Sequence, residues 1–208
     1  MTEPFGMLNP SPRLLLGPGP SQISPRVLRA CATPLLGYLD PEYVELMDET
    51  QQLMREVFET ENEWTVCAPG TGMAGMESAF INMLEPGDPV LVCVLGIFGE
   101  RMVEVATRCG ADVTRVDTEW GTTIQPEQVE EALQTVDPKV VAIVHAETST
   151  GVLQPLDEIS ALTHEAGALF LVDCVTSLGG VPVKVDERNI DVAYSGTQKC
   201  LGAPPSLS

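Results

Sequence analysis

Hydrophobic residues beyond Glu63 alternate between two patterns. Continuous runs rich in Val, Ile and Leu are separated by segments in which apolar residues recur every three or four positions. Continuous runs are typical of strands buried on both faces of a parallel sheet, and the spaced pattern is typical of helices packed on that sheet. The predicted strands are 64–68, 89–95, 112–117, 139–146, 168–173 and 191–195, and the predicted helices are 72–84, 98–109, 126–136 and 155–167.

This alternation predicts the fold class α/β, as a three-layer α/β/α domain with a mainly parallel central sheet. Residues 1–24 are rich in Pro and Gly and have no hydrophobic period, which indicates an extended N-terminal arm. Asp40-Pro41 marks the start of a long helix with an apolar face. We therefore expect residues 25–208 to form one domain, whose last nine residues, CLGAPPSLS, add no closing element.

Composition and charge reduce the number of function classes that fit this chain. The chain has 208 residues, of which 44% are hydrophobic, and 30 acidic against 11 basic residues give a net charge of −19. A surface this negative repels phosphate backbones and anionic lipids, so nucleic-acid and membrane partners are not expected. The six cysteines form no CxxC pair, which is typical of reduced thiols and not of a zinc site or a disulfide framework. Without a signal peptide or a long apolar span, the expected location is cytoplasmic.

A glycine-rich loop at residues 70–75, GTGMAG, follows the first predicted strand and begins a helix. Its spacing matches the GxGxxG dinucleotide motif, but the next strand ends in GIFG and lacks the acidic residue that such a site requires. Exposed N–H groups and the helix dipole still make this helix start a candidate anion site. The alternative is a tight strand–helix turn without a ligand.

Asp173 and Lys199 follow two neighbouring predicted strands. Asp173 ends the apolar run ALFLVD, at the edge where open α/β sheets bind ligands, although an Asp there also serves as a helix cap. Lys199, one of three lysines, follows the run DVAYS and has small or apolar neighbours. A lysine without an acidic partner can act as an amine nucleophile toward a carbonyl, whereas the alternative is a solvated turn lysine.

A phosphate cradle, a strand-end Asp and a turn Lys together suit pyridoxal phosphate. The aldehyde needs an amine, the pyridine nitrogen needs a carboxylate, and the phosphate needs N–H donors. Phe98 is the candidate aromatic ring against the pyridine, unless it is a plain core residue. Thr148 and Ser149 could bond the ring oxygen or the phosphate, or could serve only in a turn.

Several motifs resemble the class V, fold-type I aminotransferases, in particular the branch of alanine–glyoxylate and serine–pyruvate aminotransferases. They extend over essentially the whole chain and are LLLGPGPS (14–21), PGTGMAGMESAF (69–80), LEPGD (84–88), GIFGER (96–101), HAETSTGVLQPL (145–156), LVDCVTSLGG (171–180) and YSGTQKCLGAPP (194–205).

The resemblance implies a role for each matching residue. Lys199 would bind the cofactor covalently and Asp173 would face the pyridine nitrogen; both are the predicted catalytic residues. The remaining predicted cofactor-binding residues are Phe98 as the stacking ring, Thr148 near the ring oxygen, the phosphate loop Thr71, Gly72 and Met73, and Val175 and Gln198 along the cofactor.

The resemblance also implies transamination between alanine or serine and glyoxylate or pyruvate, in a homodimer with a shared active site. Ureidoglycine–glyoxylate transamination, a class V lyase or desulfurase, and an inactive fragment are the alternatives. Family members continue beyond the lysine into a small C-terminal domain, and that part holds the arginine for the substrate carboxylate. The chain is therefore expected to be an N-terminal part that is inactive alone.

Overall fold

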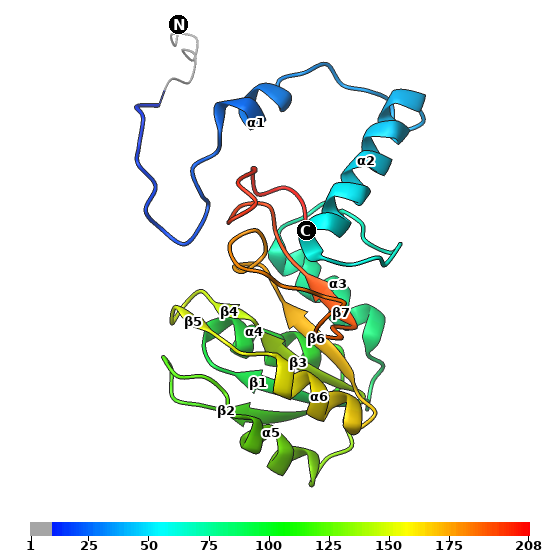
Figure 1. Ribbon diagram of the computed structural model, residues 1–208, viewed down its shortest axis with the longest axis vertical. Helices are drawn as coiled ribbons and strands as arrows, with labels where there is room; N and C mark the ends of the chain where they lie inside the picture. The colour runs from blue at the N-terminus through cyan, green and yellow to red at the C-terminus, as the bar shows by residue number, and fades with distance from the viewer. Residues whose placement is uncertain (1–9) are drawn as a thin grey trace, which may run out of the picture.

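The computed structural model describes residues 10–208 and is built around a five-stranded sheet in the order β2-β1-β3-β6-β7 (Figure 1). Every pairing in this sheet is parallel. A separate two-stranded antiparallel hairpin, β4-β5, follows β3. The strands are β1 (Pro89–Val94), β2 (Asp112–Asp117), β3 (Val140–Val144), β4 (Ala146–Glu147), β5 (Val152–Leu153), β6 (Leu169–Asp173) and β7 (Val192–Tyr194).

Helices cover both faces of the sheet, which confirms the predicted three-layer α/β/α class. Helices α3 and α4 pack together against one face, and α5 and α6 pack together against the other, in front in Figure 1. The helices are α1 (Pro25–Ala30), α2 (Pro41–Phe58), α3 (Gly72–Met83), α4 (Ile97–Arg108), α5 (Pro126–Leu133) and α6 (Asp157–Glu165). The helices predicted around the sheet are all present, within three residues of their expected ends.

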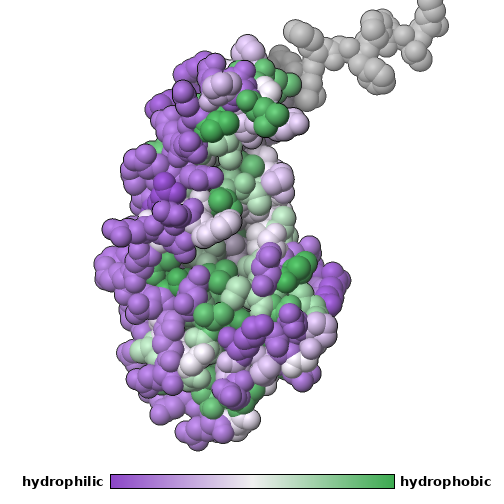
Figure 2. All heavy atoms as spheres, turned by 90° about the vertical axis from the view of Figure 1, so that its right-hand side faces the viewer, coloured by the Kyte–Doolittle hydropathy of each residue, from purple (hydrophilic) through white to green (hydrophobic). Residues whose placement is uncertain are grey.

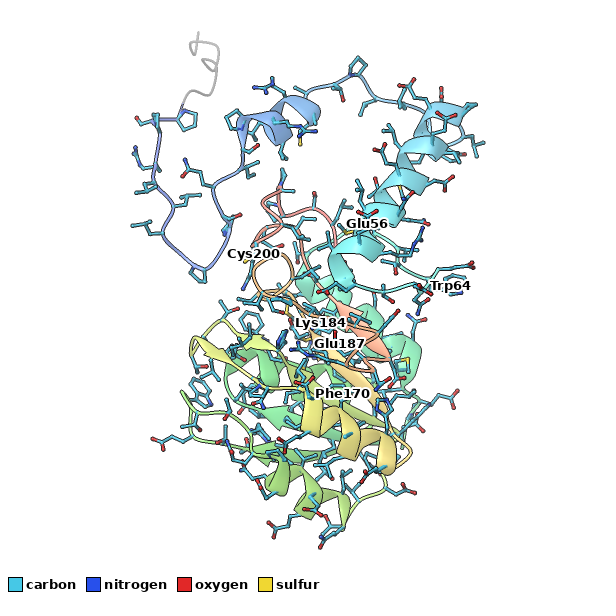
Figure 3. All side chains as sticks on the ribbon, viewed as in Figure 1. Glu56, Trp64, Phe170, Lys184, Glu187 and Cys200 are labelled. Carbon is cyan, nitrogen blue, oxygen red and sulfur yellow. The ribbon has the colours of Figure 1, made fainter. Side chains whose placement is uncertain are left out.

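The core lies where the continuous apolar runs were predicted. All five residues of β3 are buried, and Phe170 of β6, labelled within the sheet body in Figure 3, is fully buried. Strands between two helical layers have no solvent face, which is why these runs do not alternate with polar residues.

Two predicted strands differ from the structure. Residues 64–68 are extended but join no sheet; only the next residue, Pro69, forms a bridge, with Leu207. Trp64 is 87% exposed and projects from the body in Figure 3. The predicted strand 139–146 is interrupted at His145, because the chain leaves the main sheet there and begins the β4-β5 hairpin.

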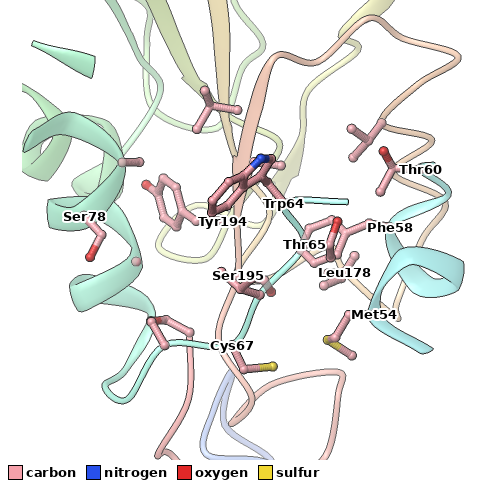
Figure 4. A pocket seen from close by; sticks show the side chains of 18 of the residues that line it. Met54, Phe58, Thr60, Trp64, Thr65, Cys67, Ser78, Leu178, Tyr194 and Ser195 are labelled. Carbon is pink, nitrogen blue, oxygen red and sulfur yellow. The ribbon is translucent and has the colours of Figure 1, made fainter. Parts of the chain in front are cut away.

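The last nine residues, expected to add no closing element, form no helix or strand but make backbone hydrogen bonds to two other segments. Ala68 and Ser208 exchange two backbone hydrogen bonds, of 2.8 and 3.0 Å, and Thr197 N–H donates to the carbonyl of Leu207 at 3.2 Å. A groove of about 500 Å³ adjoins this contact, between segment 64–68 and β7 (Figure 4).

The N-terminal helices pack little against the rest of the chain. Asp40 caps α2 by accepting a hydrogen bond from the Glu42 N–H at 2.9 Å, yet neither α1 nor α2 contains a buried residue. Of the predicted apolar face of α2, only Val57 and Phe58 pack against the core. Figure 2 shows apolar side chains interrupting the hydrophilic surface on the side of the molecule that lies to the right in Figure 1. Among residues 10–208, no helix combines the length and apolarity that crossing a bilayer requires.

Candidate active site

The predicted site residues gather at one edge of the main sheet. Parallel strands all end at the same edge, so residues that follow β1, β3, β6 and β7 become neighbours there. A cavity of about 560 Å³ at this edge is lined by Thr148, Thr176 and Lys199, together with Gly17 and Pro18 of the N-terminal arm.

The Lys199 amine is held by hydroxyl groups. Nζ donates to Thr148 Oγ1 at 2.6 Å and to Thr176 Oγ1 at 3.0 Å, and these two hydroxyls also bond each other. The amine lies 5.2 Å from the centre of the Phe98 ring. Burial lowers the pKa of Lys199, and the Asp173 and Glu147 carboxylates oppose that shift. Lys199 is therefore not the solvated turn lysine of the alternative interpretation.

The hairpin between β4 and β5 positions Thr148. Glu147 is the last residue of β4, and the chain turns back through residues 148–151 to reach β5. Gly151 completes the turn with a φ of 76°, a left-handed conformation that glycine adopts without strain. The turn thereby brings a hydroxyl from the β3 side of the sheet to the lysine that follows β7.

Asp173 is buried, with 3% of its surface exposed, and both of its oxygens accept hydrogen bonds. Val175 N–H donates to Oδ1 and Tyr194 OH donates to Oδ2, each at 2.8 Å. Burial raises the pKa of Asp173 to about 6, although these two hydrogen bonds lower it. The charge of this carboxylate is therefore costly to keep without a cationic partner.

The glycine loop forms the start of α3. Thr71 stands at the N-cap position, and within residues 10–208 the backbone N–H groups of Gly72 and Met73 have no acceptor. The Met73 side chain packs against the core, so only its backbone faces the loop. Two free donors at the positive end of a helix can bind an anion.

Close approach of three loops explains the small residues around this helix start. A Cβ on Gly72 would lie 2.8 Å from Val175 Cγ2, and one on Gly196 would lie 2.8 Å from Gln198 Oε1 and 3.0 Å from Gly72 N. Gln198 Oε1 is itself buried without a hydrogen-bond partner among the described residues. Val175 and Gln198 therefore lie beside the glycine loop.

The N-terminal arm contacts the lysine loop of its own chain. Ser21 N–H donates to the Gln198 carbonyl and Ser21 Oγ donates to the Lys199 carbonyl, both at 2.7 Å. No sequence signal marks this pairing, because the hydroxyl and the lysine carbonyl are 178 residues apart. Residues 1–9 of the predicted arm lie outside the described residues.

Sequence reasoning missed three further residues of the site. Thr176 accepts from Lys199, Tyr194 donates to Asp173, and Glu147 is a buried carboxylate with 1% exposure. A hydroxyl residue soon after a strand end was a usable signal for Thr176. Tyr194 could be found only from the sheet register, which places it opposite Asp173.

Comparisons with known proteins identify the family of this chain. The model of the family Aminotransferase class-V matches residues 14–205. The chain belongs to the class-V aminotransferases. It is 46% identical over 196 residues to the alanine–glyoxylate aminotransferase of Rattus norvegicus and 44% identical to the (S)-ureidoglycine–glyoxylate transaminase of Bacillus subtilis.

Both alignments cover 94% of this class-V chain and 47% of the relative, so the chain spans about half the length of the curated relatives it matches. The crystal structure of an alanine–glyoxylate aminotransferase from Nostoc sp. superposes with a TM-score of 0.96 at 48% identity, over 98% of this chain and 54% of that one. The family and the fold expected from the sequence motifs are confirmed.

Proposed function

We propose that this chain is the pyridoxal-phosphate-binding part of an aminotransferase that acts on small amino acids and 2-oxo acids. The main support is the position of two groups at the same edge of the sheet. The buried Asp173 carboxylate ends strand β6, and the half-buried Lys199 amine follows the neighbouring strand β7. The aldehyde of pyridoxal phosphate requires such an amine, and its ring nitrogen requires such a carboxylate.

The residues present fit this cofactor. The free N–H groups of Gly72 and Met73 suit its phosphate. The Gln198 amide, whose oxygen is buried without a partner among residues 10–208, would donate to the phosphate once its N–H₂ group faces the loop. Thr71 would add its hydroxyl to the same cradle.

Around the ring, Phe98 would stack on the pyridine, Val175 would contact it from the Asp173 loop, and Thr148 would bond the ring oxygen. Asp173 can accept a further hydrogen bond, because each of its oxygens has a second lone pair beyond the one used by Val175 or Tyr194. When bound, pyridoxal phosphate supplies an electron sink for the bonds around the substrate Cα.

The chain's own residues would control the protons. Burial lowers the pKa of Lys199 and so increases the fraction of neutral amine, which can attack a carbonyl or take a proton from Cα. Thr148 and Thr176 accept the Nζ hydrogens and thereby orient its lone pair. Asp173, with a pKa of about 6, is mostly ionised at neutral pH and would keep the ring nitrogen protonated.

Glyoxylate is the best-supported amino acceptor, because the names of the rat and the Bacillus relatives both include it. Alanine or serine is the proposed donor and pyruvate the second proposed 2-oxo acid; ureidoglycine is the alternative donor, since the two relatives are almost equally similar to this chain. A class V lyase or desulfurase would need a reactive cysteine loop that the motifs do not contain.

A homodimer with a shared active site is the proposed assembly. Helices α1 and α2 have no buried residue, and the surrounding segments expose large apolar side chains that a second copy would cover. The most exposed of these are Leu14, Leu16, Leu35, Tyr38 and Leu39, between 73% and 99%. Residues 1–24 would be the arm and 25–208 a partial pyridoxal-phosphate-binding large domain, in a cytoplasmic protein.

Labelling tests the proposal. The protein is incubated with pyridoxal phosphate, reduced with borohydride and digested, and the modified lysine is identified by mass spectrometry. We expect the label on Lys199, because Lys139 and Lys184 are paired with Asp88 and Glu187 on the surface. A label confined to either surface lysine would contradict the site.

Turnover with glyoxylate then identifies the donor. Alanine, serine and ureidoglycine are compared in the whole protein that contains this chain, with Lys199→Ala as the control. We expect alanine or serine to be used and the control to be inactive. Turnover with ureidoglycine alone would favour the alternative donor.

A further inference from the structure

The first turn of α4 is capped by side chains from another part of the sequence. Phe98 N–H donates to Glu147 Oε2 at 3.1 Å, and Ile97 N–H donates to Ser149 Oγ at 3.0 Å. The residue at the N-cap position of α4 is Gly96, which has no side chain to serve as a cap. Glu147 and Ser149, which follow β3, supply the missing acceptors.

Glu147 is surrounded by donors. Besides Phe98 N–H, it accepts Ser149 N–H at 3.0 Å and Ser149 Oγ–H at 2.7 Å, both at Oε1. Among residues 10–208 this side chain accepts three hydrogen bonds, which a carboxylate group can do at its two oxygens, whereas an amide would place its N–H₂ group against a donor. The positive end of α4 also favours a negative charge at this place.

The fit between this carboxylate and α4 is tight. A Cβ on Gly96 would lie 2.4 Å from Glu147 Cγ and 2.5 Å from Ser149 Oγ, so only glycine permits the approach. With Glu147 only 1% exposed, water has little access to replace it as the acceptor of the Phe98 N–H. Glu147 is therefore the acceptor that holds the Phe98 N–H in the described structure.

Phe98 is the aromatic ring beside the candidate lysine, 5.2 Å from Lys199 Nζ. We propose that Glu147 is a positioning residue: by holding the Phe98 N–H, it sets the Phe98 ring at the pyridoxal phosphate site. This inference rests on the proposed function. Glu147 acts through Phe98 and makes no hydrogen bond to Lys199 within residues 10–208.

Hydrogen exchange tests the positioning without the cofactor. Amide exchange in the whole protein that contains this chain is followed by NMR for the unsubstituted protein, Glu147→Gln and Ser149→Ala. A charge-assisted hydrogen bond protects its donor by roughly 10- to 100-fold, so Glu147→Gln should speed exchange at Phe98 by about that factor. Ser149→Ala, a change at an exposed residue, should instead act mainly at Ile97. Unchanged protection of Phe98 in Glu147→Gln would overturn the inference.

Cofactor affinity tests whether Glu147 acts through the ring. Pyridoxal phosphate is titrated into the whole protein that contains this chain, in its unsubstituted form and as Glu147→Gln, Phe98→Ala and the double variant. We expect Glu147→Gln to weaken binding about tenfold when Phe98 is intact and less than about twofold when the Phe98→Ala substitution is already present. Equal losses in both backgrounds would refute a positioning role. If the unsubstituted whole protein does not bind the cofactor, the proposed function fails, while the exchange data still decide the role of Glu147.

Discussion

Asp173→Asn should make the cofactor-free protein more stable at neutral pH while it weakens the active site. The substitution keeps the shape of the side chain and removes a charge from a residue that is only 3% exposed. Asn can still accept one of the two hydrogen bonds, from Val175 or Tyr194, and its N–H₂ group can donate to the Tyr194 oxygen after that hydroxyl turns.

The magnitude follows from the pKa of Asp173, which burial raises from 3.8 to about 6. A carboxyl with a raised pKa binds its proton more tightly in the folded state. Its contribution to stability is complete below about pH 3.8 and is lost as the pH rises through about 6. The difference between a pKa of 3.8 and one of about 6 corresponds to about 3 kcal/mol, the expected advantage of Asp173→Asn above pH 6.

The assay is urea unfolding between pH 4 and pH 8, in the absence of pyridoxal phosphate. The difference in unfolding free energy between Asp173→Asn and the unsubstituted protein should grow from near zero at the acidic end to about 3 kcal/mol at pH 8. Asp137→Asn, at an exposed residue, is the matched control and should change stability by less than about 0.5 kcal/mol throughout.

Adding pyridoxal phosphate should make the unsubstituted protein the more stable of the two. The ring nitrogen gives the buried carboxylate a cationic partner, so the cofactor should stabilise the unsubstituted protein more than Asp173→Asn. A stability difference that stays constant from pH 5 to pH 8 would refute the argument that burial of the charge raises the pKa. Equal stabilisation of both proteins by the cofactor would remove Asp173 from the ring-nitrogen role.

Three further substitutions probe other parts of the site and the core. Tyr194→Phe removes the 2.8 Å hydrogen bond to Asp173; it should raise the pKa of Asp173 and cost about 1–3 kcal/mol of stability by leaving a buried acceptor unpaired, as the same pH-dependent urea series would detect. Gly196→Ala places a Cβ 3.0 Å from Gly72 N, so it should weaken pyridoxal phosphate binding in a titration and destabilise the fold by about 1–3 kcal/mol; unchanged affinity would argue against the loop as the phosphate site. Phe170→Ala empties a fully buried position in β6 and should lower the unfolding free energy by about 3–5 kcal/mol in urea, whereas a loss below about 1 kcal/mol would contradict its place in the core.

The hydrophobic pattern alone determined the layered fold. Strands such as β3 and β6 are buried on both faces, so their apolar runs are visible in sequence without any knowledge of their neighbours. Segment 64–68 has a similar composition but joins no sheet. Composition indicates only that a segment can form a strand. Strand pairing also requires a neighbouring strand with free backbone groups at the right register.

The principal candidate residues of the site could also be predicted, because they lie in local motifs. Asp173 ends one strand and Lys199 follows the next, and the parallel topology places both strand ends at one edge. The glycine loop likewise indicates a helix start with free N–H groups. These predictions needed only the order of the elements along the chain.

The supporting contacts were decided by the tertiary structure. Glu147 accepts the N–H of a residue 49 positions earlier, and Ser21 holds the carbonyl of a lysine 178 residues away. No period or motif links such partners. A hydrogen bond requires a donor–acceptor distance that is correct to within a few tenths of an ångström, and only the packing of the loops fixes that distance. The sequence therefore indicated which groups are candidates for the chemistry, and the fold determined which groups hold them in place.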